Sequence, residues 1–167
     1  MTASDAFLPS GEIHPIDIVE AHATDRAWDF DRLGEDQIAM AVEGLWRTYS
    51  VTLSWSPGDE MLRLIATFEF DPPEGGQDRI LDLLARVNDM VWGGGFHWWP
   101  DQKLMVWRYG LMLAGGQIAT PEQVGGMIAQ AIRAAERFYP AFQMCAWGEA
   151  TPDRALQVAL AEAYGRA

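Results

Sequence analysis

Two apolar runs separated by a short turn, residues 48–56 and 61–70, form the clearest pattern in the chain. In the first run, apolar side chains occupy every second position from Tyr49 to Trp55, which is the period of a half-buried strand. The second run is apolar on both faces, as in a strand that lies inside a sheet. Pro57-Gly58-Asp59 has the residue types that a tight reversal favours. The pattern predicts a β-hairpin on which the rest of the sheet is built.

Three further apolar stretches predict the remaining strands of one antiparallel sheet. Residues 38–43 lead into the first hairpin, while 96–99 and 104–113 form a second hairpin around a turn at 100–103. The earlier segment 28–31 alternates aromatic and acidic side chains, so we expect it to be extended, but we assign the first sheet strand to 38–43. The sequence thus predicts five strands joined as antiparallel neighbours.

Helices are predicted where apolar residues recur at every third or fourth position. The strongest, 120–138, opens on Thr120-Pro121-Glu122-Gln123, which is a cap residue, a proline in the first turn and a glutamine three residues after the cap. We expect Pro140 to end or kink this helix. Residues 80–91 predict a second helix that covers the sheet, and the three glycines at 93–95 should end it.

Two shorter helices complete the order α-β-β-β-α-β-β-α with an extra C-terminal helix. They lie at residues 16–24 and in the segment that begins at Thr151. The predicted fold is α+β, a single five-stranded antiparallel sheet with helices packed on it. We expect residues 1–15 to be a flexible lead-in and residues 16–167 to form one domain.

Composition narrows the class of protein. The 167 residues include 24 acidic and 12 basic ones, a net charge of -12, which disfavours nucleic acid and anionic membrane surfaces as partners. The single cysteine, Cys145, cannot form an internal disulfide, and no stretch resembles a secretory signal or a membrane span. These features predict a cytoplasmic protein.

No group of residues has the spacing of a catalytic or metal site. His14, His22 and His97 lack partners at ligand spacing. No histidine lies near Cys145 in the sequence to lower its pKa, so an inert thiol is expected. The glycine clusters lack the nearby basic residue, or the strand-to-helix order, of a phosphate loop. We therefore predict no catalytic residue, no cofactor and no bound metal.

The acidic residues near the N-terminal end leave two interpretations open. Asp29, Asp31, Glu35 and Asp36 are dense enough for an acid/base pair or a hard-cation site. Their alternation with aromatic residues favours a solvated strand face instead.

Aromatic residues of the second hairpin are the main candidates for function. Trp98 and Trp99 are neighbours on a strand and must point to opposite faces, whereas Trp107 and Tyr109 share one face. Burial in the core is the default for such side chains. A protein-binding face formed by these four residues is the sharper alternative, because they offer more aromatic surface than a covering helix buries. The aromatic content, together with the family resemblance described below, predicts a homodimer in which a second copy covers some of the apolar surface.

Three segments carry a family resemblance. They are the strand pair TYSVTLSWSPGDEMLRLIATFEFDPP, the helix ILDLLARVNDMVWGGGF, and QKLMVWRYGLML with the helix at 120–138. Over about residues 16–142 the chain resembles the YbjN family of bacterial sensory transduction regulators. That family is similar in fold to type III secretion chaperones, which are small acidic dimers that bind extended segments of other proteins. The resemblance implies another protein as partner, and no cofactor or catalytic residue.

Two hypotheses about function follow. The first is a non-enzymatic protein-binding or regulatory module with a chaperone-like fold. The second is a small-molecule binder or hydrolase that uses an acidic and aromatic pocket. A deep enclosed pocket with convergent polar groups would favour the second, since an enzyme needs one and a protein-binding face does not.

Overall fold

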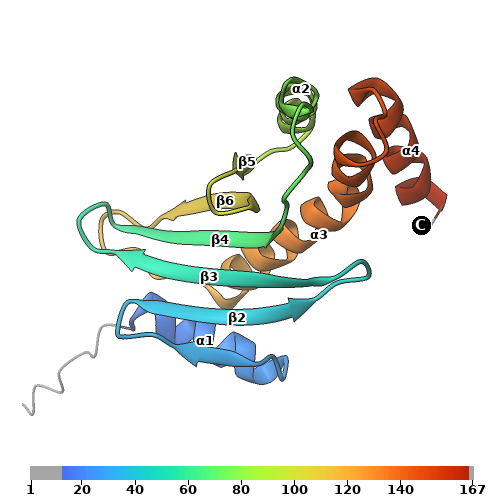
Figure 1. Cartoon of the computed structure of the whole chain (residues 1–167). Coiled ribbons are helices and arrows are strands. Elements are labelled where there is room, and N and C mark those ends of the chain that lie inside the picture. The colour runs from blue at the N-terminus through green and yellow to red at the C-terminus, as the bar shows by residue number, and fades with distance from the viewer. Residues whose placement is uncertain (1–12, 166–167) are drawn as a thin grey trace, which may run out of the picture.

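Among the residues that the structure describes, six antiparallel strands form one sheet, and four helices accompany it (Figure 1). The computed structural model describes residues 13–165. The elements are α1 (Pro15–Asp25), β1 (Phe30–Arg32), β2 (Gln37–Glu43), β3 (Thr48–Ser56), β4 (Met61–Glu69), α2 (Gln77–Asp89), β5 (Gly95–Trp99), β6 (Leu104–Met112), α3 (Pro121–Ala146) and α4 (Pro152–Gly165). The expected lead-in, residues 1–15, lies almost entirely outside the described residues.

The order of strands in the sheet is β1-β2-β3-β4-β6-β5. The hairpin of β3 and β4 is confirmed, with Val51 opposite Ala66. β4 lies between β3 and β6, which agrees with its apolar residues on both faces. In the turn of this hairpin, the left-handed backbone conformation falls at Glu60, with φ of 49°, rather than at Gly58.

The prediction of five strands was wrong by one, because β1 pairs with β2 and adds a sixth. Phe30 lies opposite Met40, and the amide of Ala41 donates to the carbonyl of Asp29. The alternation of residues 28–31 had indicated extended backbone. A pairing segment of only three residues gives too short a pattern to assign to a sheet.

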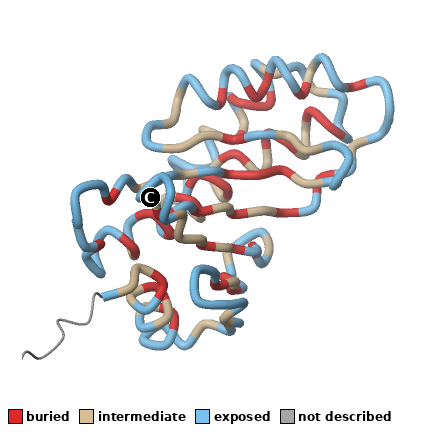
Figure 2. The backbone as a smooth tube through the Cα atoms, turned by 90° about the vertical axis from the view of Figure 1, so that its left-hand side faces the viewer, coloured by how far each residue is buried: buried red, intermediate tan, exposed pale blue. Residues whose placement is uncertain are grey.

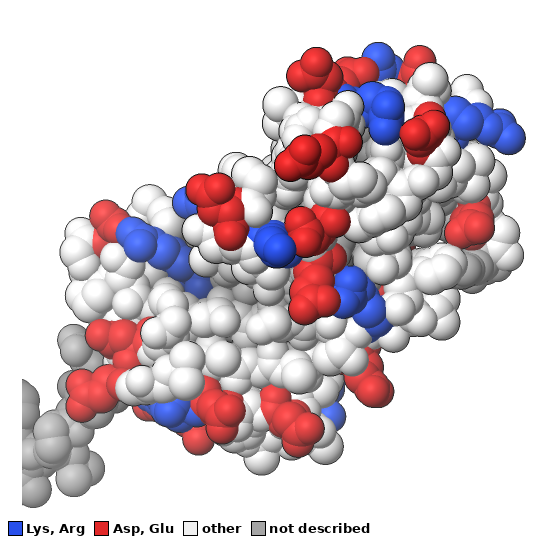
Figure 3. Space-filling model, in the orientation of Figure 1, with Lys and Arg blue, Asp and Glu red and all other residues white. Residues whose placement is uncertain are grey.

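Helices cover one face of the sheet and leave the other bare. α1 and α3 lie behind the sheet in the view of Figure 1. Many residues of the strands and helices are buried (Figure 2), and nearly all the buried apolar residues belong to one hydrophobic core. α2 packs against the β5 edge and against α3, and α4 packs against α3 and α2. The helix predicted at residues 80–91 to lie on the sheet contacts the sheet at its β5 edge. The bare face, seen in Figure 3, is largely uncharged between scattered acidic and basic side chains.

Two helix ends differ from the prediction. α3 continues through Pro140 to Ala146, because the apolar stripe goes on beyond the proline and buries Phe142 and Cys145. That burial offsets the backbone hydrogen bond that proline removes. α2 ends at Asp89 instead of extending to residue 91. The capping box at Thr120 and Gln123 is present as predicted.

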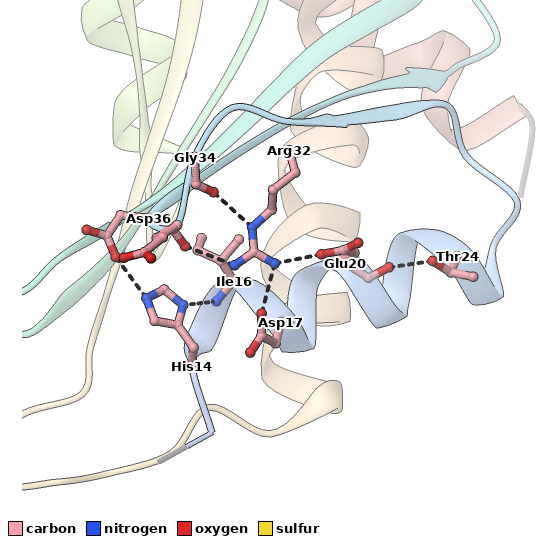
Figure 4. A network of polar contacts seen from close by, with 9 residues as sticks. His14, Ile16, Asp17, Glu20, Thr24, Arg32, Gly34 and Asp36 are labelled. Carbon is pink, nitrogen blue, oxygen red and sulfur yellow. Dashed lines mark hydrogen bonds and ion pairs between the residues drawn. The ribbon is translucent and has the colours of Figure 1, made fainter. Parts of the chain in front are cut away.

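A network of polar contacts attaches α1 to the turn between β1 and β2 (Figure 4). The Arg32 guanidinium donates to Asp17 at 2.8 Å and to Glu20 at 2.6 Å, and also to the carbonyls of Gly34 and Glu35. His14 caps α1 by accepting from the amide of Ile16, and its other ring nitrogen lies 2.8 Å from Asp36. One of the candidate carboxylates, Asp36, therefore has a structural contact.

Candidate functional site

The four aromatic residues of the second hairpin do not form one surface. Trp107 is 1% exposed and belongs to the core beneath α3. Trp98 and Tyr109 point to the same helix-covered face and are half-buried, and the Trp98 ring lies 6.2 Å from that of Phe70. Trp99, also half-buried, points to the bare face. The structure thus brings three of them to one side of the sheet and separates the fourth.

Within the described residues, the titratable candidates do not gather into a metal-binding group. No group of three His, Cys, Asp or Glu residues that could hold a metal occurs among residues 13–165. His22 packs edge-on against Trp28, and its pKa is lowered, chiefly by burial. Cys145 is buried, and burial raises the pKa of its thiol. None of the described helices is long and apolar enough to span a membrane.

The prominent surface feature is a hollow of about 1100 Å³ along α3, open to solvent. Large apolar side chains stand exposed around it: Trp92 is 87% exposed, Leu45 71% and Trp46 39%. Exposed aromatic and aliphatic groups gathered in this way are typical of surfaces that bind another molecule. We call this region the α3 surface and define it by Gln130, Arg133 and Arg137 of α3, Arg26 and Trp28 beside α1, Leu45 and Trp46 between β2 and β3, and Trp92 between α2 and β5.

A two-residue turn forms one side of the α3 surface. The amide of Gly44 donates to the carbonyl of Arg47 at 2.9 Å, which leaves Leu45 and Trp46 at the tip. The carboxylate of Glu136, on α3, accepts from the amide of Leu45 at 2.8 Å and from that of Trp46 at 3.2 Å. This carboxylate therefore satisfies the free amides of the turn and fixes the turn to α3.

Gly44 and Tyr49 complete this attachment. A Cβ at Gly44 would lie 2.3 Å from an oxygen of Glu136, so only glycine lets the carboxylate approach. The Tyr49 hydroxyl donates to Glu136 at 2.5 Å. Burial, followed by this hydrogen bond, raises the pKa of Tyr49 above its ordinary value. Trp46 in turn stacks on Tyr139, with ring centroids 6.3 Å apart.

The loop between α2 and β5 forms another side of the α3 surface. The side-chain amide of Gln130 donates to the carbonyl of Trp92. Asn88 binds both the amide and the carbonyl of Phe96, which ties the end of α2 to the edge of the sheet. Gly94 lies against the Trp107 indole, where a Cβ would come within 2.4 Å of the ring. The loop is thus held on both sides, and Trp92 points out from it.

Sequence reasoning missed Trp92, Leu45 and Trp46. A signal did exist for Trp92, which follows the last apolar position of the helix predicted at 80–91 and precedes three glycines. A residue placed between a helix end and glycines has few side chains to pack against. Leu45 and Trp46 carried a weaker signal, because the turn beside Gly44 was not assigned.

The hollow along α3 combines exposed apolar side chains with basic ones. Its charged residues are three arginines and Glu136, and the oxygens of Glu136 already accept hydrogen bonds. A general base or nucleophile acts beside a partner group. Besides Glu136, the lining contains one such candidate, His22, whose ring packs edge-on against Trp28. The hollow is open, not the enclosed pocket that the hydrolase hypothesis requires.

Comparisons with known proteins agree with the family resemblance. The profile of the YbjN family, described as "Putative bacterial sensory transduction regulator", matches residues 15–144. A solved structure of YbjN from E. coli, described as "a putative transcription regulator", is similar in fold: the TM-score is 0.51, the identity is 14%, and the match covers 71% of this chain and 84% of that chain. No curated protein matches the chain. On the extent of the profile match, the chain belongs to the YbjN family.

Proposed function

We propose that this protein is a non-enzymatic binding module that acts in the cytoplasm by capturing another protein at the α3 surface. The observation that carries the proposal is Trp92, which is 87% exposed beside the 71% exposed Leu45. Truncating a large aromatic side chain at a binding hot spot typically costs about 2 kcal/mol or more. The family description as a regulator is compatible with such a role. A chaperone-like fold and a homodimer belong to the same proposal.

The aromatic residues of the second hairpin have supporting roles in this proposal. Trp107 forms the floor of the hollow, and Tyr109 lies near Gly93 and Gln130 beside it. Trp98 braces the core through Phe70. We assign contact with the partner to Trp92, Leu45 and Trp46, because these side chains are exposed.

One observation favours a small ligand as the second candidate. The indole N–H of Trp107 is buried without a hydrogen-bond partner within the described residues, and the residue lines the hollow. A buried donor of this kind is costly unless it is satisfied. In an NMR titration, a small acceptor at this site would shift the Trp107 indole resonance, whereas a protein on the α3 surface would shift that of Trp92.

Site-specific photo-crosslinking tests the main proposal. A photoreactive residue is placed at Trp92, and a matched one at Leu81 of α2, which is 55% exposed and does not line the hollow. After irradiation in native cells, mass spectrometry identifies the adducts. We expect a discrete protein adduct from position 92 that is absent from position 81. Adducts shared by both positions, or none at 92, would place binding elsewhere.

A further inference from the structure

We propose that the α3 surface binds an acidic segment of its partner, one that carries Asp or Glu side chains beside an apolar or aromatic anchor. This inference rests on the proposed function and names the chemistry of the partner. Its basis is the distribution of charge around the hollow.

The α3 surface is basic, although the chain as a whole is acidic. The protein has a net charge of -12, yet three of the four charged residues around the hollow are arginines, Arg26, Arg133 and Arg137. Among the described residues outside the hollow, five basic side chains form ion pairs, whereas Arg79, Arg108 and Arg154 form none. The five are Arg32, Arg47, Arg63, Arg86 and Lys103. The arginines of the hollow form no ion pair with any residue between 13 and 165. Their charge is therefore available to a partner.

The three arginines are placed to act together with the apolar groups. Arg133 and Arg137 are one helical turn apart on α3 and lie on the same side of it. The Arg137 guanidinium lies 5.0 Å from the centroid of the Phe138 ring, against an apolar part of the lining. Arg26 is exposed at the end of α1, and its neighbour in sequence, Asp25, does not pair with it.

Glu136 forms no ion pair with these arginines. Its two oxygens accept from the amides of Leu45 and Trp46 and from the hydroxyl of Tyr49. The carboxylate is thus used to hold the turn, and the guanidinium groups on either side of it remain without an acidic partner.

A protein segment fits this pattern better than other anions. Arginine presents a planar fork of donors that matches carboxylates, and the exposed Trp92 and Leu45 require an apolar group at the same site. A long polyanion such as nucleic acid would also meet the remaining acidic surface of the chain, which repels it. Carboxylates and an apolar anchor occur together on a short stretch of polypeptide.

The test starts with selection from a library of random twelve-residue peptides displayed against the full-length protein. We expect the recovered peptides to be enriched in Asp and Glu and to carry at least one aromatic or leucine residue. Recovered peptides that are neutral or basic, or a selection that yields no binder, would overturn the proposal.

Charge reversal at matched positions then locates the contact. In one variant Arg133→Glu and Arg137→Glu are combined, and in the control Arg108→Glu and Arg154→Glu are combined, since both control arginines are exposed, unpaired within the described chain and outside the hollow. The two variants have the same net charge. We expect the first to weaken peptide binding by about tenfold or more and the control to change it by less than about twofold. Equal weakening would mean a general charge effect and would contradict the proposal.

Two further measurements separate the possible failures. Melting followed by circular dichroism should show that both variants are folded, and if the first is not, Arg133→Gln with Arg137→Gln replaces it. Suppose that the selected peptides bind the wild type, fail to bind the Trp92→Ala variant and are not acidic. That result would contradict the proposed acidic segment but support the proposed function. Peptides that are insensitive to Trp92→Ala would contradict the proposed function itself. Competition by oligo-dT or by phosphatidylserine vesicles would indicate a different anionic partner and overturn the inference.

Discussion

The hydrogen bonds between Glu136 and the turn at residues 44–47 can be tested by a single substitution. Glu136→Gln keeps the size of the side chain but replaces one oxygen with a donor group. The remaining oxygen can still accept from the Tyr49 hydroxyl and from the Trp46 amide. The new side-chain NH₂ group faces the Leu45 amide and cannot accept from it. Hydrogen bonds to a charged group contribute about 1.5–3 kcal/mol. We expect a loss of about 2 kcal/mol in the free energy of unfolding.

Urea denaturation at neutral pH measures this loss. For an m-value of about 2 kcal/mol/M, the midpoint should fall by roughly 1 M with m unchanged. The matched control is Glu43→Gln, which removes the same charge. Glu43 is exposed at the end of β2, next to the same turn. We expect that control to change stability by less than about 0.5 kcal/mol.

A double-mutant cycle with Tyr49→Phe isolates the buried hydrogen bond. Residues in direct contact show interaction free energies of about 0.5–3 kcal/mol, and the 2.5 Å distance from the Tyr49 hydroxyl to Glu136 predicts a coupling of at least about 1 kcal/mol between Glu136→Ala and Tyr49→Phe. Additive effects, or a Glu136→Gln variant as stable as the wild type, would refute the attachment of the turn to α3.

Four other predictions test separate parts of the structure. Gly94→Ala should lower the free energy of unfolding by about 1–3 kcal/mol, because a Cβ would lie 2.4 Å from the Trp107 ring; a melt at wild-type temperature would contradict this packing. The pKa of Tyr49 is raised from 10.0, so its contribution to the free energy of unfolding should be fully present below about pH 10 and fall by up to about 1.4 kcal/mol per pH unit above it. The alkaline loss of stability should be smaller in Tyr49→Phe. An equal loss in both proteins would contradict the buried hydrogen bond of Tyr49. Cys145 is buried with a raised pKa, so a thiol reagent should label it only on unfolding, and rapid labelling of the native protein would place it at the surface. The expected homodimer requires a mass above 18.6 kDa in light scattering, and a monomer mass at every concentration would exclude it.

Much of the fold was readable from local patterns. Alternation located five strands because their apolar and polar faces differ, and the cap at Thr120 located the start of the longest helix. The pairing of β3 with β4 followed from a short turn between two compatible runs. β1 was missed because three residues carry too little periodicity, and α3 exceeded its predicted end because burial beyond Pro140 outweighs the local penalty.

The candidate site was harder to predict because it depends on contacts between distant segments. Alternation correctly gave the direction of Trp107 and Tyr109 but could not show that α3 covers them. Conversely, nothing local connects Leu45 with Glu136, which lies 91 residues further along the chain. The unpaired arginines are also a tertiary property, since pairing depends on which carboxylates the fold brings near.

Capture of the crosslinked partner by two matched double variants tests the central claim most directly. Leu45→Ala with Trp92→Ala removes the exposed apolar groups of the α3 surface, and Leu81→Ala with Ile118→Ala removes two side chains that are each 55% exposed and lie outside its lining. If the α3 surface is the binding site, the first variant should bind the partner about tenfold or more weakly, while the second binds as the wild type does and both melt near the wild-type temperature. Wild-type affinity in a folded Leu45→Ala/Trp92→Ala variant would contradict the assignment.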